Sequence, residues 1–436
     1  MTRWAQSLSA VLLLASASVA GADIPNLGPA PVFTEPDIER AALGQLLFYD
    51  PILSGNRNIS CASCHHPRFG TSDGVSLSLG EGGIGLGPDR HPDPANLPEQ
   101  RLPRNAPALW NLGASEFTVM FHDGRLEVAS QEPNGIRTPL GEDMTAGFDS
   151  VLSAQSMFPV LSADEMAGHY SENEISRSVR LGLLSQQGGA WDQLAARVQA
   201  IPAYADGLQM VRRVEESDGF PLISNLIADF IRFEWRADNS AFDRAMRGDG
   251  VLDPAAQRGM ELFYGKAGCA ECHSGWFQTD HAFHAIAMPQ IGPGKSARFE
   301  SHARDEGRMR VTGDAADAYA FRTPSLRNVT LTAPYGHNGA YTDLDSVIRH
   351  HLDPVAALES YRMEQALLPA LKDAKDTSAL HDPQELARIA AASDLAPLAL
   401  GDAEIADLIA FLGALTDDAR RLGVPETVPS GLPVDR

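Results

Sequence analysis

The four cysteines of this 436-residue chain occur in two copies of one pattern, in which thiols at positions i and i+3 are followed directly by a histidine. Thiols at this spacing can form thioethers with the two vinyl groups of a porphyrin, and the adjacent imidazole can coordinate the iron. The pattern therefore predicts two covalently bound haem c groups, held by Cys61-Ala62-Ser63-Cys64-His65 and Cys269-Ala270-Glu271-Cys272-His273.

Other uses of these cysteines explain the pattern less well. A zinc ribbon needs its two thiol pairs near each other in the chain, whereas these pairs lie in opposite halves of it. A thioredoxin-like dithiol needs a pair beside a βαβ unit, and the sequence indicates none. Ordinary disulfides leave the roles of His65 and His273 unexplained.

The charge balance restricts the classes of partner that the protein can bind, and the N-terminus indicates where in the cell it is located. The chain has 57 acidic and 35 basic side chains, a formal net charge of -22. This argues against a nucleic-acid or anionic-membrane partner, because phosphate binding requires clustered Lys and Arg. Arg3, the apolar run 10–15 and the small residues 20–22 are typical of a secretory signal peptide. We therefore expect export to the periplasm, and no later segment is apolar and long enough to span a membrane.

The elements that position the haems are predicted to be mainly α-helical. We expect two cytochrome c-like haem domains, with long loops and one short hairpin. The expected division is a signal peptide (1–22), an N-terminal haem domain (23–215), a connecting helix (216–252), a C-terminal haem domain (253–420) and a tail (421–436).

Apolar periodicity and capping patterns predict several individual helices. Residues 222–246 begin with helical apolar spacing, and residues 402–415 place their apolar side chains on one face. A capping box at 162–165 predicts a helix that continues to about residue 184. The Gly-rich run 80–87 is interpreted as a flexible loop, because it lacks the strand and helix context of a dinucleotide site.

Motifs outside the two pentads make the chain resemble the bacterial di-haem cytochrome c peroxidase family, a superfamily that includes the methylamine-utilisation maturation enzyme MauG. The resemblance extends from about residue 38 to residue 417. The matching segments are 43–50 (LGQLLFYD), 53–54 (LS), 104–107 (RNAP), 121–125 (FHDGR), 321–328 (FRTPSLRN) and 331–339 (LTAPYGHNG).

This resemblance implies that the first haem is the peroxidatic one, with His65 as its proximal ligand. A haem peroxidase needs an acid-base group above the iron to move a proton between the peroxide oxygens. The family's distal glutamate follows the Asp-Gly-Arg motif and precedes a Met. The segment Gly-Glu-Asp-Met at 141–144 then makes Glu142 the expected acid-base residue, with Asp143 as the alternative and Gln131 as its polar partner.

Many family members also hold a distal histidine on the first haem until the second haem is reduced. At the corresponding spacing this chain has Glu81. His91 is the nearby histidine, and we interpret it as a surface residue. Without a distal histidine the first iron would be permanently five-coordinate, as in MauG.

The second haem would be the electron-transfer site, with His273 as its proximal ligand. An amphipathic helix over 343–352, capped by Thr342 or Asp343, places His351 on its apolar face and His350 off that face. Relatives carry Met or Tyr at the position of His351. A histidine there predicts a bis-His, low-spin haem of lower potential than His/Met ligation gives. The alternative is a core histidine bonded to a backbone carbonyl.

The resemblance also implies two features between the haems. Many relatives have an electron-relaying Trp at the position of His122, and we expect Trp110 to lie close to this position in the fold as a substitute. Family members bind one calcium ion between the domains through an Asn side chain and two carbonyls, which match Asn105, Thr332 and Pro334. Oxygen ligands suit a hard cation of this kind.

The expected function is that of a periplasmic di-haem peroxidase. It would reduce hydrogen peroxide with electrons from an external donor such as a small cytochrome c or a cupredoxin, and a homodimer is compatible with this role. One alternative is a MauG-like enzyme that uses peroxide to oxidise Trp or Tyr of a partner protein. The other is a di-haem electron carrier with no turnover of its own.

Overall fold

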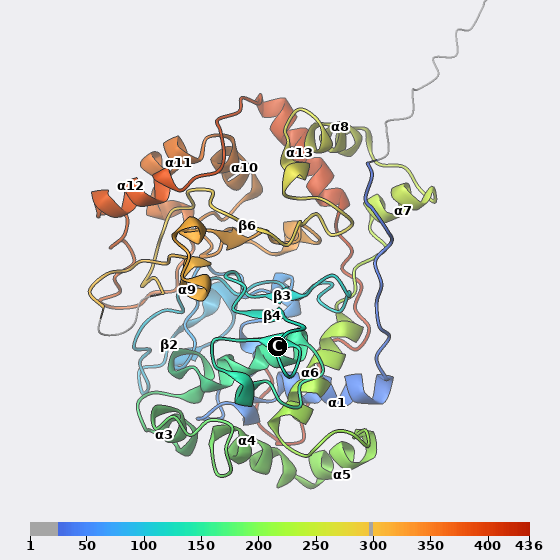
Figure 1. The fold of residues 1–436 in the computed structure, drawn as a ribbon, viewed down its shortest axis with the longest axis vertical. Helices are drawn as coiled ribbons and strands as arrows, with labels where there is room; N and C mark the ends of the chain where they lie inside the picture. Colours follow the sequence, from blue (N-terminus) through green and yellow to red (C-terminus); the bar gives the residue numbers. More distant parts are fainter. Residues whose placement is uncertain (1–24, 296–299) are drawn as a thin grey trace, which may run out of the picture.

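The computed structural model describes residues 25–295 and 300–436, so the expected signal peptide, residues 1–22, lies outside the described residues. Two lobes are stacked along the long axis of the molecule (Figure 1). We call the part containing α1 to α6 the N-terminal lobe and the part containing α7 to α13 the C-terminal lobe. Within the ranges just given, no helix is long and apolar enough to cross a membrane.

The structure is largely helical, as predicted. The N-terminal lobe contains α1 (Ile38–Tyr49), α2 (Val151–Ala154), α3 (Glu174–Arg180), α4 (Ala190–Gln199), α5 (Pro202–Val211) and α6 (Phe220–Glu234). The C-terminal lobe contains α7 (Ala241–Arg247), α8 (Pro254–Tyr264), α9 (Met309–Thr312), α10 (Leu344–Leu352), α11 (Pro354–Ser360), α12 (Pro383–Ala391) and α13 (Asp402–Ala414).

The strands are short and form three small antiparallel sheets rather than one hairpin. They are β1 (Gly83–Ile84) with β2 (His91–Pro92), then β3 (Val119–Met120), β4 (Leu126–Val128) and β5 (Ile136–Arg137), and finally β6 (Phe283–His284) with β7 (Phe321–Arg322). Strands β3, β4 and β6 lie where the two lobes face each other (Figure 1).

Each lobe is built on the same crossing of two helices. α1 packs on α6, and α8 packs on α13. At the crossing points stand Gly44 and Gly259, where an added Cβ would lie 1.9 Å from a backbone carbonyl oxygen of the facing helix. Only glycine permits so close an approach. The motif Gly-x-x-Leu-Phe-Tyr is shared by residues 44–49 and 259–264, so both pentads follow the same kind of helix.

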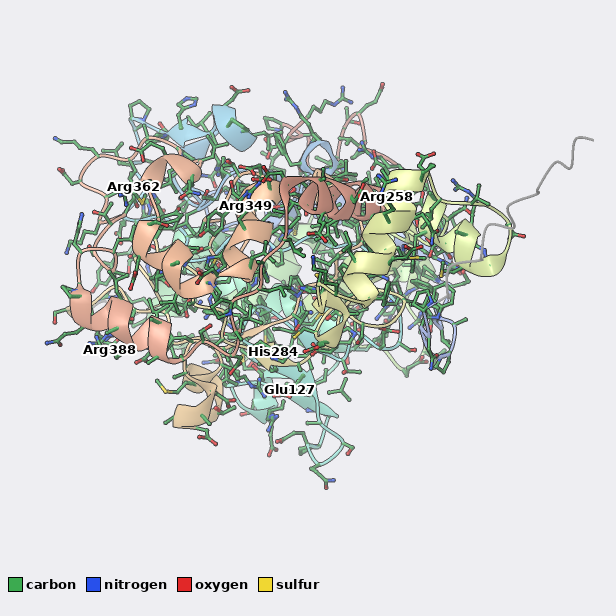
Figure 2. All side chains as sticks on the ribbon, turned by 90° about the horizontal axis from the view of Figure 1, so that it is seen from above. Glu127, Arg258, His284, Arg349, Arg362 and Arg388 are labelled. Atoms are coloured by element: carbon green, nitrogen blue, oxygen red, sulfur yellow. The ribbon has the colours of Figure 1, made fainter. Side chains whose placement is uncertain are left out.

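Aromatic packing repeats in the same positions. Phe48, four residues after the first crossing glycine, packs on Phe230 with ring centroids 5.3 Å apart. Phe263, four residues after the second, packs on Phe411 at 5.1 Å. On the outside of the C-terminal lobe, ion pairs from Arg258 and Arg349 join α8 and α10 to α13 (Figure 2).

Two of the helices predicted from the sequence are confirmed, one is divided into two and one is wrong. α10 and α13 occur as expected, and the Asp343 carboxylate caps α10 by accepting from the Ser346 N–H at 2.7 Å. The helix expected over 222–246 is divided, because residues 235–240 separate α6 from α7. The capping box at 162–165 opens only a single π-helical turn, which ends at Gly168 with a φ of 97°.

The C-terminal segment 421–436 is part of the N-terminal lobe rather than a separate tail. The Glu234 carboxylate at the end of α6 accepts hydrogen bonds from the backbone N–H groups of residues 421–423. The Ser430 hydroxyl donates to Asp50 at 2.7 Å. Figure 1 accordingly marks the C-terminus within the N-terminal lobe. α6 is likewise a core helix of this lobe, not a free connector.

Candidate haem centres

A cavity in the N-terminal lobe contains the first pentad. Cys61, Cys64 and His65 line it, together with the half-buried acid Glu165. The cavity encloses about 1240 Å³, its open mouth included. The remaining wall is mainly apolar, as is typical of a cofactor site, and includes Phe48, Ile59, Leu109, Phe121, Leu152, Phe158, Ile227 and Ile231.

The cysteine chemistry in this cavity agrees with covalent attachment rather than redox exchange. Burial raises the pKa of Cys61 and Cys64 to about 12. A thioredoxin-like dithiol needs a lowered thiol pKa instead. All four cysteines are free of disulfides, and the second pair lies in the other lobe, which excludes a shared zinc ribbon.

Three histidines are held in the same way. The Nδ1 atom of His65 lies 3.0 Å from the Thr71 carbonyl oxygen, that of His273 lies 3.0 Å from the Gln278 carbonyl, and that of His351 lies 2.8 Å from the Val347 carbonyl. A carbonyl can only accept, so Nδ1 carries the proton and Nε2 keeps its lone pair. This is the arrangement expected of metal-binding histidines, and it fits a haem iron at all three.

His350 differs from its neighbour His351 in this respect. Both of its ring nitrogens have partners, because Nδ1 lies 3.0 Å from the Tyr341 hydroxyl and Nε2 lies 2.7 Å from the Ile286 carbonyl. His350 is therefore a satisfied core histidine. His351 lies close enough to His273 to lower its pKa, after the larger effect of burial, so the two candidate axial ligands are brought together.

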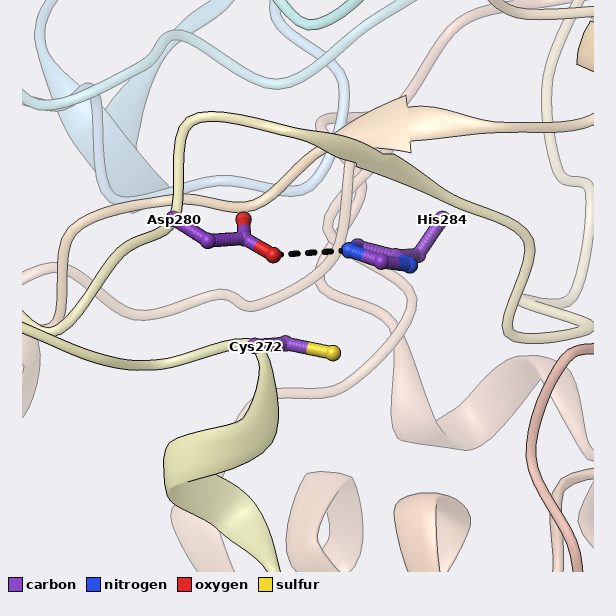
Figure 3. A group of neighbouring side chains, drawn as sticks. All are labelled: Cys272, Asp280 and His284. Atoms are coloured by element: carbon purple, nitrogen blue, oxygen red, sulfur yellow. Dashed lines mark hydrogen bonds and ion pairs between the residues drawn. The ribbon is translucent and has the colours of Figure 1, made fainter.

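Cys272, Asp280 and His284 form a group whose ligand atoms all lie within 4.8 Å of one another (Figure 3). The Asp280 carboxylate pairs with His284 Nε2 at 2.9 Å. Cys272 is also the second thiol of a haem-attachment pentad. Because a thioether sulfur no longer offers a thiolate to a metal ion, we assign this group to the wall of the second haem centre.

The acid of the N-terminal cavity is Glu165, which stands on the π-helical turn Ala163–Ala167. It precedes Met166, as the family pattern requires of the distal glutamate. Burial raises its pKa, and the opposing attraction of Lys295 is smaller. Gln155 lines the same cavity.

The structure does not bring the acid expected from the sequence into this cavity. Glu142 and Asp143 are exposed on a short turn, of which only Met144 is buried, and Gln131 is exposed in the loop between β4 and β5. None of the three lines the cavity. The acid and the amide that line this cavity are therefore Glu165 and Gln155, not Glu142 and Gln131.

Basic side chains line part of the cavity wall. Arg104 and Arg125 share the carboxylate of Asp123, and Lys295 reaches the cavity from the C-terminal lobe. Burial and the two arginines lower the pKa of Lys295 to about 8. Such a positive wall suits the two propionates of a haem.

His122 and Trp110, the two residues expected between the haems, are each held by a hydrogen bond to a backbone carbonyl. His122 lines the cavity, and its Nε2 lies 3.1 Å from the Asn105 carbonyl oxygen. Burial, helped by Arg104, lowers the pKa of His122 to about 4, so the ring is neutral near pH 7. Trp110 is buried and donates to the Gly70 carbonyl at 2.9 Å, and it does not line the cavity.

The residues expected to bind calcium are near the lobe boundary. The Asn105 amide donates to the carbonyls of Val75 and Ser76 at 2.8 and 3.2 Å. Thr332 donates to Val329, and Pro334 follows a cis peptide bond. No hydrogen bond within the described part of the chain joins Asn105 to Thr332 or Pro334.

The Gly-rich loop is held more firmly than its composition predicts. The Arg90 guanidinium donates to the carbonyls of Leu79, Gly80 and Gly85. Glu81 is buried in this loop, and His91 is exposed, as expected for a surface histidine.

Comparisons with known proteins agree with these centres. Residues 38–251 match the family model of the di-haem cytochrome c peroxidases. The methylamine utilization protein MauG of Methylorubrum extorquens is 30% identical over 72% of this chain and 69% of its own length. The cytochrome-c peroxidase IdrP2 of Denitromonas iodatirespirans is 30% identical over 70% of this chain and 71% of its own.

A crystal structure of a MauG-like protein associated with microbial copper homeostasis has the same fold. It superposes with a TM-score of 0.57 at 27% identity, and covers 91% of this chain and 95% of its own. The two pentads, the three histidines held at Nδ1 by carbonyls and these relatives lead to one conclusion: the chain belongs to the di-haem cytochrome c peroxidase family.

Proposed function

We propose that this protein is a periplasmic di-haem peroxidase, which reduces hydrogen peroxide with electrons from a small cytochrome c or a cupredoxin. The observation that carries the proposal is the position of Glu165. Its carboxyl lines the same cavity as Cys61, Cys64 and His65, where a haem would be attached. An acid in the same cavity as an attached haem is what peroxide cleavage needs and what simple electron transfer does not.

The residues of the cavity have separable roles. A haem attached here supplies the iron at which the peroxide O–O bond is reduced. Glu165, as the carboxylate, accepts a proton from the bound peroxide and then donates it to the departing oxygen. Gln155 is the polar partner on the same wall. The raised pKa of Glu165 brings both proton-transfer steps nearer to neutral pH.

The C-terminal lobe would supply the electrons. His273 and His351 would hold the iron of its haem, which would pass electrons rather than react with peroxide. The acidic chain, with a formal net charge of -22, suits a donor with a basic surface. We retain calcium at Asn105, Thr332 and Pro334 as part of the proposal, and metal analysis of the purified protein checks it.

Replacing Glu165 by Gln tests this function directly. The change keeps the size of the side chain and removes its proton transfer, so peroxide turnover should fall by about 10²- to 10⁴-fold. Turnover is measured with reduced cytochrome c as the donor.

Glu142→Gln is the matched control, because that side chain is exposed and outside the cavity. It should keep wild-type turnover. Full activity of Glu165→Gln would refute the assigned role of Glu165.

A MauG-like oxidation of a partner protein is the second candidate function. It is favoured by the set of histidines that line the cavity, which among the described residues consists of His65 and His122. His65 would hold the iron, and the Asn105 carbonyl anchors the ring of His122 at Nε2, so no unanchored histidine lines the cavity among the described residues. Addition of peroxide to the diferric protein should then produce a near-infrared charge-resonance band. Its absence would exclude this function and leave the peroxidase.

A further inference from the structure

The carboxyl of Glu165 has no hydrogen bond of its own among the described residues. Its place in the cavity is therefore set by the backbone of the π-helical turn Ala163–Ala167 that carries it. A π-turn is uncommon and often occurs at functional sites. What holds this turn thus decides where the proposed proton-transfer group stands.

Three carbonyls of the turn are held by donors from outside it, two of them from distant segments. The Glu81 N–H donates to the Asp164 carbonyl at 2.9 Å, and the Gly55 N–H donates to the Met166 carbonyl at 2.7 Å. The Asn173 amide donates to the Ala167 carbonyl at 3.0 Å. The turn is thereby fixed on both sides of Glu165.

Glycines allow two of these segments to approach so closely. A Cβ at Gly80 would lie 2.0 Å from the Asp164 carbonyl oxygen, and a Cβ at Gly55 would lie 1.9 Å from the Ala167 carbonyl oxygen. Both distances are far below any real contact, so the Gly-rich loop and the segment before the first pentad are packed directly against the turn.

Glu81 is the centre of the side-chain network behind the turn. It is 1% exposed, and its Oε1 accepts from the Nδ2 atoms of Asn56, Asn58 and Asn96 at 3.0, 2.9 and 2.7 Å. Hydrogen bonds to a carboxylate are stronger than those between neutral groups, so the charge of Glu81 holds three segments together. No ion pair satisfies this carboxylate within the described ranges of the chain.

The same network reaches the far end of the turn. Asn56 accepts at its Oδ1 from Asn173 at 3.0 Å, and Asn173 is the residue that holds the Ala167 carbonyl. Glu81 is therefore connected to the turn twice, at Asp164 through its own backbone and at Ala167 through Asn56 and Asn173.

We propose that Glu81 is a positioning residue for Glu165, whose buried negative charge fixes the π-turn and so the distance of the acid from bound peroxide. The inference rests on the proposed function. It gives Glu81 a static role in the peroxide reaction at the place where many relatives carry a mobile distal ligand. Small displacements of a reacting group are costly, since about 1 Å can reduce a rate by about 10²-fold.

Glu81→Gln tests the inference, because it removes the charge and keeps the shape. The expected result is a holoprotein with wild-type haem content, a kcat for peroxide on the order of 10-fold to 100-fold lower and a KM close to wild type. Cyanide association with the ferric protein is the second measurement, since Glu165 must accept the proton of HCN. Its pH dependence should change in Glu81→Gln. Glu142→Gln is again the control.

The outcomes separate the inference from the function on which it rests. Full peroxide turnover in Glu165→Gln would refute the proposed function. An inactive Glu165→Gln together with unchanged kcat and cyanide kinetics in Glu81→Gln would overturn the inference alone. If Glu81→Gln does not fold, Asn96→Ala, which removes one of the three donors, takes its place. Unchanged kcat and cyanide kinetics in that variant would overturn the inference equally.

Discussion

The adjacent histidines of α10 show how a single hydrogen bond separates a ligand from a core residue. His350 uses both ring nitrogens for Tyr341 and Ile286, whereas His351 uses only Nδ1. The helical periodicity predicts His351 on the apolar face of α10 and His350 off that face. It could not predict that His350 is also buried, because Tyr341 and Ile286 come from other parts of the chain.

This difference makes a prediction for the second haem. His351→Ala should convert it from low-spin to high-spin, because the free Nε2 is lost as a sixth ligand. Electron paramagnetic resonance of the resting protein measures the change. His350→Ala is the control, and it should reduce stability while keeping the low-spin signal. A low-spin signal that survives in His351→Ala would place the ligand elsewhere.

Glu165 could have been selected from the sequence, because it stands directly before a Met, whereas Asp143 separates Glu142 from Met144. An acidic pair before a Met occurs twice, as Glu142-Asp143-Met144 and as Asp164-Glu165-Met166. The first copy lies nearer to the Asp-Gly-Arg motif, and the second was explained as a capping box. Only tertiary structure shows that the first is exposed and that the second lies beside Cys64 and His65.

At the scale of elements, the repeated helix crossing makes a second prediction. Gly44→Ala and Gly259→Ala should each lower the free energy of unfolding by about 1–3 kcal/mol or more, because the new methyl would overlap a carbonyl of the facing helix. Thermal unfolding of the haem-loaded protein measures this.

Gly413→Ala in α13 is the matched control for these two variants. No atom lies within 4 Å of a Cβ at that position. Alanine is the better helix former by about 0.5–1 kcal/mol, so this variant should be as stable as wild type or more stable. Equal stability of all three variants would contradict the close crossing.

Helices could be predicted where one face of the helix was apolar and its ends carried a recognisable signal such as a capping residue. α10 has its Asp343 cap and α13 its apolar face, and both were placed within two residues. The helix expected over 162–184 failed because its first turn is held by the Gly-rich loop and by Gly55 rather than by its own periodicity. Local patterns do not show such partners.

At the scale of the whole molecule, each end of the described chain packs against the lobe that is formed by the opposite half of the sequence. The segment 421–436 leaves the C-terminal lobe and returns to α6, where Glu234 accepts three of its N–H groups. Leu27, near the start of the described chain, joins the hydrophobic core of the C-terminal lobe. Composition could not predict this, because both segments read as polar, proline-containing ends. This packing ties the two proposed haem centres to one framework.

The ion pairs of Arg104 connect the two lobes, and they lead to a prediction about the stability of the fold at low pH. Arg104 pairs with Asp123 of its own lobe at 2.7 Å and with Asp305 of the C-terminal lobe at 2.7 Å, and all three side chains are buried. Arg104 holds the pKa of both carboxyls well below the usual range, against the opposing effect of burial. Depressed carboxyl pKa values stabilise the fold above the ordinary pKa of an aspartate, near 4, and this stability is lost as the pH falls below it.

Arg104→Met should remove both ion pairs of Arg104, including the one that connects the two lobes. Two buried carboxylates would lose their shared partner, so the free energy of unfolding near pH 7 should fall by about 3–5 kcal/mol. The loss should shrink as the pH is lowered through the ordinary aspartate range, because the carboxyls of the variant take up protons there. Unfolding by denaturant across this pH range measures both effects. A stability difference between wild type and variant that does not change with pH would show that Arg104 joins the lobes by packing and not by charge.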